Sequence, residues 1–132
     1  MSGDIITLKL PAKPEYVMVA RLTSAAIASR FDFDVDQIED VKMSVAEALI
    51  LIIKQAASPK ELSVQFRFEH ENMHIDIIGE GDWEQNPISP HDTDQTQLSR
   101  YILGSMMDGV EFKTDNGLMR AICMHKGCGG AN

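Results

Sequence analysis

One acidic side chain, Glu47, stands inside a strongly apolar stretch of the sequence. It belongs to Ser44–Ala57, and the run Leu49–Ile53 after it consists of five large apolar residues. We interpret this stretch as the second half of a long helix, in which a lone carboxylate could be a general base or a solvated or hydrogen-bonded acid. A helix that is apolar on every side must be buried on every side, so this one is predicted to be covered all round.

A second group with potential chemistry lies near the C-terminus, where Cys123 and Cys128 flank His125. A zinc site would need a fourth ligand, and this spacing matches no standard zinc knuckle. The sequence therefore predicts no metal site. Cys123 is expected to be a small apolar residue in a final strand, and Cys128 to lie in a glycine-rich tail.

The net charge limits the kinds of partner. The 132 residues include 20 acidic residues against 12 Lys and Arg, a formal charge of −8. This charge argues against binding to the phosphates of a nucleic acid and against binding to an anionic membrane surface. A basic or mixed-charge protein partner suits it, and simple solubility explains the charge equally well.

Two further features bear on location. No apolar run approaches the roughly 18–20 residues of a membrane span. The first residues, Met1-Ser2-Gly3-Asp4, lack the basic and apolar regions of a signal peptide. We therefore expect a cytoplasmic protein without membrane contact.

The elements that must position these residues follow from the spacing of apolar side chains. Alternation predicts strands at 4–10, 62–68, 73–77, 110–114 and 118–124. Helical spacing predicts helices at 15–30, 36–57 and 98–106. Asp36 and Glu39 are predicted to form a capping box at the start of the second helix, and Gly109 to close the third. The long segment 79–97 is expected to be a functional lid or a disordered loop.

The order of these elements suggests an α+β fold. We predict a two-layer sandwich in which a mostly antiparallel, mixed five-stranded sheet carries three helices on one face. The length favours one domain, predicted to span residues 1–125, with 126–132 as a flexible tail.

Several short segments resemble one protein family. They are Pro11–Val17, Arg21–Thr23, Ala28–Arg30, Ile38–Lys42, Val45–Ala48 and Met107–Val110. They are similar to segments of the bacterial anti-sigma-factor serine kinases, members of the GHKL superfamily with a histidine-kinase-like ATPase (Bergerat) fold. The similarity extends over residues 4–125, and the predicted element order fits that fold.

The resemblance implies an ATP site, but the first of its motifs is incomplete. Glu47, the implied general base, and Ala48 match the motif, whereas Leu51 stands at the magnesium-binding Asn position and Gln55 at the His position. Mg²⁺ requires hard oxygen ligands, which a Leu methyl group cannot supply.

The motifs for adenine and phosphate are also incomplete. The family's Asp-x-Gly motif is Gly79-Glu80-Gly81 here, without the Asp that receives the adenine amino group. Glu80 cannot replace that Asp, because neighbouring strand residues face opposite ways. The glycine-rich phosphate loop corresponds to Thr96–Arg100, which has Leu98 at its centre and contains no glycine.

These three losses together indicate that the fold is kept and the kinase site is not, because phosphoryl transfer needs the metal and the phosphates positioned at once. The resemblance then implies an anti-sigma-type regulator that binds a sigma factor or a STAS-domain antagonist, without ATP or Mg²⁺. Whether it is an enzyme stays open, since a divergent serine kinase that uses ATP and Mg²⁺ on an antagonist is the alternative. A homodimer, or a module that dimerises with an active relative, also stays open.

Partner contacts are expected on the first helix and the connector after it. The candidates are Glu15, Arg21, Arg30 and Phe33. Arg21 stands where the family has a partner-contacting Arg, and an ordinary surface Arg is the alternative. Two apolar residues have open roles: Leu51 fills the core or forms a contact surface, and Trp83 packs locally or anchors a partner. No catalytic role is predicted for any of these residues.

Overall fold

The computed structural model describes residues 3–55, 60–80, 94–115 and 118–127. Its elements in chain order are β1 (Ile5–Pro11), the 3₁₀ turn η1 (Pro14–Tyr16), α1 (Val17–Ala28), α2 (Val35–Gln55), β2 (Glu61–Glu69), β3 (Asn72–Glu80), α3 (Asp94–Met106), β4 (Gly109–Asp115) and β5 (Leu118–Gly127). The predicted order of strands and helices is confirmed.

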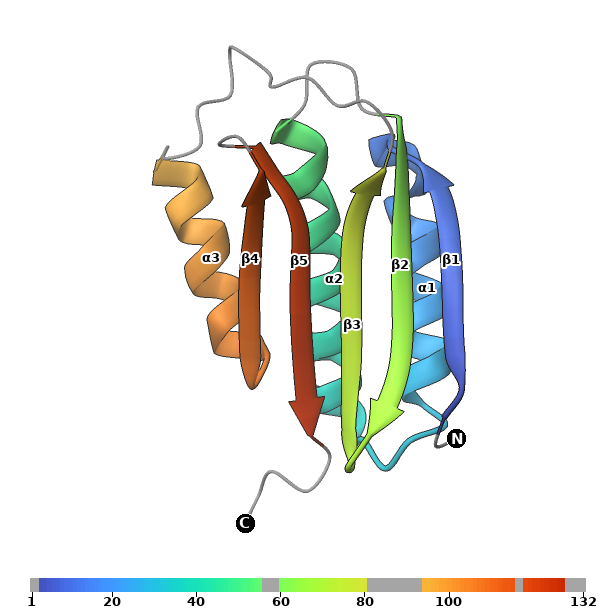
Figure 1. Cartoon of the computed structure of the whole chain (residues 1–132). Helices are drawn as coiled ribbons and strands as arrows, with labels where there is room; N and C mark the ends of the chain where they lie inside the picture. Colours follow the sequence, from blue (N-terminus) through green and yellow to red (C-terminus); the bar gives the residue numbers. More distant parts are fainter. Residues whose placement is uncertain (1–2, 56–59, 81–93, 116–117, 128–132) are drawn as a thin grey trace.

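The strands form one sheet in the order β1-β2-β3-β5-β4, and the helices cover one face of it (Figure 1). All four pairings are antiparallel. The predicted α+β two-layer sandwich is confirmed, while the described strands contain no parallel pair and the sheet is therefore not mixed.

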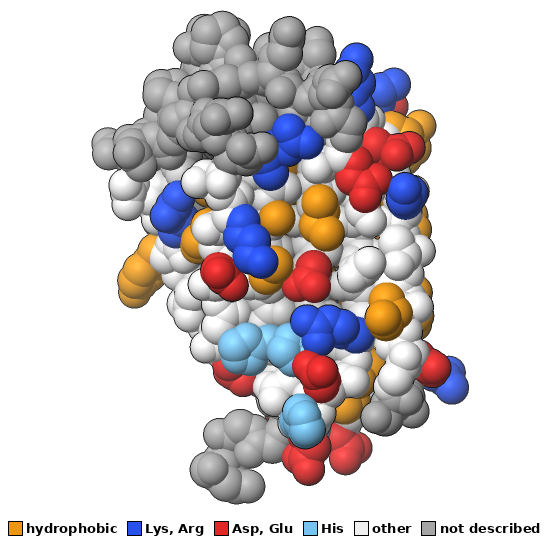
Figure 2. Space-filling view, viewed as in Figure 1, with side chains coloured by type: hydrophobic (Ala, Val, Ile, Leu, Met, Phe, Trp, Pro, Cys, Tyr) orange, Lys and Arg blue, Asp and Glu red, His pale blue; other side chains and the backbone are white. Residues whose placement is uncertain are grey.

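The core fills the space between the sheet and the helices. Because successive strand residues point to opposite faces, each strand presents every second side chain to the helices. The side chains that β2 and β3 present to the core are all buried: Leu62, Val64, Phe66, Phe68, Met73, Ile75 and Ile77. None of the described helices covers the opposite face of the sheet, which is largely polar (Figure 2).

The central helix α2 is not buried on every side. Leu49 and Ile52 are buried, but Ile50 is 37% exposed and Met43 is 52% exposed. Since α2 lies between α1 and α3 (Figure 1), these helices cover its flanks and leave an outer stripe in water. The prediction of burial all round is wrong for this stripe.

The capping box that starts α2 lies two residues before the predicted one. The backbone N–H of Gln37 donates to Asp34 Oδ1 at 2.8 Å, and the backbone N–H of Asp34 donates to Gln37 Oε1 at 2.9 Å. This reciprocal pair satisfies two of the amides that a helix start leaves free. The prediction of a box at Asp36 and Glu39 is therefore wrong, and α2 begins at Val35.

The residue before this cap is part of the core. Phe33 is 8% exposed, and its ring lies edge-on to Phe31 with the ring centroids 5.1 Å apart. Phe33 and Ile38 occupy the two positions of a hydrophobic staple, which fixes the direction in which the chain enters a helix. Both residues pack in the core cluster.

Other boundaries also differ from those predicted. The strand β3 runs to Glu80 and α3 begins at Asp94, so both enter the segment predicted to be a loop. What remains of that segment, including Trp83, lies outside the described residues, as does Cys128. Among the helices that the structure describes, none is long and apolar enough to cross a membrane.

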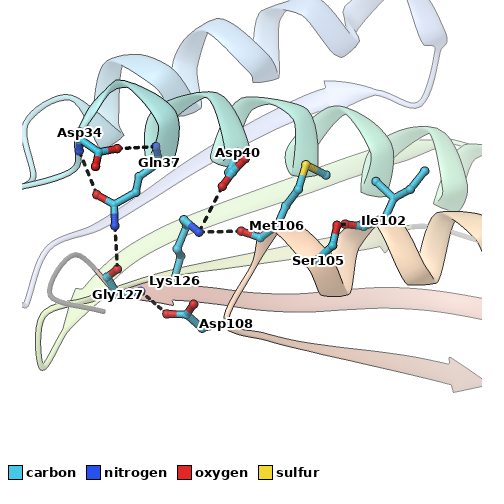
Figure 3. Close-up of polar contacts among 9 residues, drawn as sticks. All are labelled: Asp34, Gln37, Asp40, Ile102, Ser105, Met106, Asp108, Lys126 and Gly127. Atoms are coloured by element: carbon cyan, nitrogen blue, oxygen red, sulfur yellow. Dashed lines mark hydrogen bonds and ion pairs between the residues drawn. The ribbon is translucent and has the colours of Figure 1, made fainter. Parts of the chain in front are cut away.

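The strand β5 continues to Gly127, so two residues of the predicted tail, Lys126 and Gly127, belong to this strand. Lys126 Nζ donates to the Met106 carbonyl at 2.7 Å and lies 3.5 Å from Asp40 Oδ2 (Figure 3). The backbone N–H of Gly127 donates to Asp108 Oδ2 at 2.8 Å. These contacts join the end of β5 to α2 and to the C-terminal end of α3, where a cation is favoured by the helix dipole.

Replacing Lys126 by Met should lower the free energy of unfolding by about 1–3 kcal/mol, because the Met106 carbonyl and the Asp40 carboxylate lose a mostly buried partner. Urea denaturation measures this change. The matched control is Lys113→Met on β4, where the lysine is exposed and a change below about 0.5 kcal/mol is expected. Equal effects of the two substitutions would contradict the structural role of Lys126.

Candidate functional site

Glu47 lies where α3 packs against α2. Its Oε2 accepts a 2.6 Å hydrogen bond from Ser99 Oγ, and Ser99 is only 7% exposed. A hydrogen bond to a charged group contributes about 1.5–3 kcal/mol. Of the roles left open for Glu47, this geometry favours the hydrogen-bonded helix acid over a free general base.

Ser99 is a site residue that the sequence did not reveal. In the sequence, Ser99 is only one residue of the segment Thr96–Arg100, which lacks the glycines of a phosphate loop. No local pattern links a serine to an acid 52 residues earlier in the chain. The pair forms only because α3 packs on α2, which is a tertiary contact without a sequence period.

Leu51 follows Glu47 by one helical turn and is only 4% exposed. It packs in the core cluster. Of the two roles left open for Leu51, core filling fits this burial, because a residue so covered offers a partner almost no surface. The position at which the resemblance implies a magnesium ligand is thus occupied by buried hydrocarbon.

The other predicted nucleotide positions lie on different elements. Gly79 is buried in β3, where it pairs with Leu62, and its carbonyl accepts a 3.4 Å hydrogen bond from Arg120 Nη2. Leu98 of α3 is 57% exposed. Gly81 and the side chain of Gln55 lie outside the described residues.

The described residues do not fit the magnesium nucleotide that the resemblance implies. Such a site would need an oxygen ligand at position 51 and a carboxylate at Glu47 that is not already hydrogen-bonded to the protein. In the part of the chain that the structure describes, no group of three or more His, Cys, Asp or Glu side chains could hold a metal ion. No step of phosphoryl transfer can be assigned to these residues.

The candidate partner-contact residues lie in different environments. Glu15 and Arg30 are exposed, and Arg21 is partly exposed. Within the described residues, the buried Nε of Arg21 has no hydrogen-bond partner. Phe33, in contrast, is a core residue because it forms the hydrophobic staple of α2, so its ring is not presented to a partner.

The start of α1 exposes an apolar stripe that the sequence analysis did not single out. Met18 is 54% exposed, Val19 42% and Leu22 59%. Met18 and Leu22 are one helical turn apart with Val19 beside them, so these three share one face of α1. Glu15 lies just before the helix, in η1. We call Glu15, Met18, Val19, Arg21 and Leu22 the α1 surface.

Cys123 lies in the final strand, as predicted. It is a partly exposed free thiol and pairs across the sheet with Asp76. Burial, and then the neighbouring Asp76 carboxylate, raise the pKa of the thiol. Cys123 is therefore protonated at neutral pH and is a poor nucleophile.

Comparisons with known proteins agree with this fold. Residues 10–126 match the family model of the histidine kinase-like ATPase domain. The chain is 35% identical to the serine-protein kinase RsbW of Bacillus licheniformis, in an alignment that covers 89% of this chain and 83% of that protein. It is 31% identical to the protein of the same name from Bacillus subtilis, covering 92% and 85%, and 31% identical to that of Listeria monocytogenes, covering 87% and 83%.

Restoring the polar residue at position 51 should be costly if this position is core. Leu51→Asn should lower the free energy of unfolding by about 3–5 kcal/mol, because it removes buried hydrocarbon and buries an amide that has no hydrogen-bond partner there. The adjacent Ile50→Asn, at a position 37% exposed, is the matched control and should cost less than about 1 kcal/mol. Urea denaturation compares them, and an equally mild effect at both positions would show an open, polar-tolerant site at Leu51.

Proposed function

This chain belongs to the histidine kinase-like ATPase domain family, and from that premise we propose that it regulates its partner by binding it, without transferring phosphate. It acts as an anti-sigma-type regulator. Its partner is a sigma factor, a STAS-domain antagonist or both.

The main support for the proposed loss of kinase activity is the hydrogen bond between Glu47 and Ser99, which lies beside the buried Leu51. In an active site of this family, the acid faces a nucleotide and the residue one turn later binds its metal. Here the acid is held by a neighbouring helix and the metal position is apolar. Phosphoryl transfer depends almost entirely on positioning and charge stabilisation, so both must be present for activity.

The α1 surface is the proposed contact for the partner. Its exposed apolar residues, Met18 and Leu22, supply area that becomes buried on binding, and Glu15 supplies a charge beside them. Arg21 is partly exposed and adds a guanidinium to this surface. A partner carboxylate would satisfy a guanidinium in the two-pronged geometry that Arg favours.

The overall charge of −8 supports a partner whose contact surface is basic or mixed. Sigma factors and their antagonists act in the cytoplasm, so that is where we place this chain. Assembly as a homodimer, or with an active relative, is compatible with the proposal and is not required by it.

A second candidate function is a divergent but active serine kinase that phosphorylates an antagonist. The identity of 31–35% to proteins named serine-protein kinase favours it. It requires that ATP and Mg²⁺ bind through a rearranged set of residues. Nucleotide binding therefore separates the two functions, because only the kinase requires it.

The partner is tested by purifying the tagged chain from its native host and identifying what accompanies it by mass spectrometry. Wild type should recover a sigma factor or a STAS-domain protein. Arg21→Ala should reduce that recovery about tenfold or more, since a hydrogen bond to a charged group is worth about 1.5–3 kcal/mol. Lys113→Ala on β4, away from α1, is the control and should recover as much as wild type.

The recovered complex should also weaken as salt is raised, because charge complementarity is screened. Recovery of neither protein class, or of a family relative alone, would overturn the proposed partner. Equal losses with Arg21→Ala and Lys113→Ala would overturn the assignment of the α1 surface.

A further inference from the structure

The two edges of the sheet differ in how well they are protected against pairing with another chain. In the order β1-β2-β3-β5-β4, the edge strands are β1 and β4, which lie on opposite sides of the molecule (Figure 1). An edge strand has backbone N–H and C=O groups that point away from its one neighbour, and these can pair with a further strand. Native proteins usually prevent such pairing with charged side chains, proline or a β-bulge.

The edge formed by β4 has this protection. Its side chains Glu111 and Lys113 are exposed and carry charges of both signs. A shift in the register with β5 lies between Lys113 and Thr114. Such a bulge bends the strand and increases its twist, so a further strand cannot continue the ladder along the whole of β4. This edge is therefore unsuited to pairing with another chain.

The first half of β1 lacks this protection. The strand pairs with β2 in one unbroken register from Ile5 to Pro11. Ile5 is 61% exposed and Ile6 is 38% exposed, and these neighbours point to opposite faces of the sheet. The charged residue of β1, Lys9, lies in its second half and pairs with Glu80 at 3.1 Å. Figure 2 shows hydrophobic side chains along this edge of the molecule.

A hollow of about 290 Å³ lies at the exposed start of β1. Its lining residues include the carboxylates of Asp4 and Glu69, the guanidinium of Arg67 and the side chain of Ile5. Arg67 already pairs with Glu69 at 2.9 Å, so the lining of the hollow is net acidic. A lysine or arginine from another chain can lay its apolar stem on Ile5 and place its cation beside Asp4.

We propose that β1 binds an extended segment of another protein, which pairs with the free edge from Ile5 to Lys9. The segment has apolar side chains that cover Ile5 and Ile6, and a lysine or arginine that reaches the hollow. In complexes of this kind, main-chain hydrogen bonds give affinity and the contacts of alternate side chains give specificity. This inference does not rest on the proposed function.

The charge of the chain favours a different protein over a second copy on this edge. Each copy has a formal charge of −8, and like net charges repel. The cation that a second β1 would bring, Lys9, already pairs with Glu80. A basic segment, in contrast, meets the acidic hollow with the opposite charge.

The test uses a synthetic peptide of about eight residues, in which valine and threonine alternate between a lysine at each end. Nuclear magnetic resonance of the full, isotope-labelled chain should show that the peptide shifts the backbone amides of β1 and not those of β4. Two further peptides carry N-methyl groups on one or the other set of alternate residues, which removes the donors of one edge and keeps the charge. The peptide methylated on the edge that faces β1 should lose binding, and the other should keep it.

Ile5→Lys should weaken binding of the unmethylated peptide about tenfold or more, because it removes an apolar contact and brings a lysine close to a cation of the peptide. The matched control is Tyr101→Lys on α3, where the side chain is 76% exposed and α3 lies on the far side of the molecule from β1 (Figure 1). This control adds the same charge to the chain and should leave the affinity unchanged.

Absence of binding at peptide concentrations up to about 1 mM would overturn the proposal. Binding kept by both methylated peptides would also overturn it, because the peptide would then not use its backbone. Equal effects of Ile5→Lys and Tyr101→Lys would do the same. Shifts of the β1 amides that depend on the concentration of the chain alone would show a second copy on this edge and would overturn the choice of a different protein.

Discussion

The hydrogen bond from Ser99 to Glu47 joins the middle of α2 to the first half of α3, beside the buried side chain of Leu51. It joins two helices that are otherwise in contact through apolar side chains of the core. An acid used in this way stabilises the helix pair and loses its freedom to act on a substrate. The same contact thus contributes to stability, and it is the main support for the proposal that this chain binds its partner without transferring phosphate.

The rest of the molecule holds α2 firmly in this position. At its start, Asp34 and Gln37 cap the helix and Phe33 anchors the entering chain in the core. Along its length, Asp40 pairs with the Lys126 ammonium, which also donates to the carbonyl of Met106, the last residue of α3. These contacts fix α2 against both α3 and the sheet, while Met18 and Leu22 of α1 stay exposed.

Much of this fold could be predicted from the sequence, because alternation and helical periods are local signals. The strands of the β2–β3 hairpin alternate so regularly that their core-facing residues follow directly. The start of α2 could not be chosen with certainty, since Asp34–Gln37 and Asp36–Glu39 both have the spacing of a capping box. Only the burial of Phe33, a tertiary effect, decides between them.

The candidate functional site was harder to predict, because tertiary contacts also decide its geometry. The missing Asn and Asp residues could be recognised by comparing motifs, but the partner that Glu47 gains in their place could not. Lys126 likewise has the charge of a tail residue, and its two partners lie 20 and 86 positions away in the chain. Contacts between distant segments leave no period in the sequence.

The most direct test of the account is a calorimetric titration of this chain with Mg-ATP, with the Bacillus subtilis relative as the positive control. The packing of Ser99 and Leu51 against the former site predicts no saturable binding at nucleotide concentrations up to about 1 mM, a binding free energy weaker than about −4 kcal/mol. Saturable binding with a micromolar dissociation constant would contradict the claim that this protein acts without nucleotide.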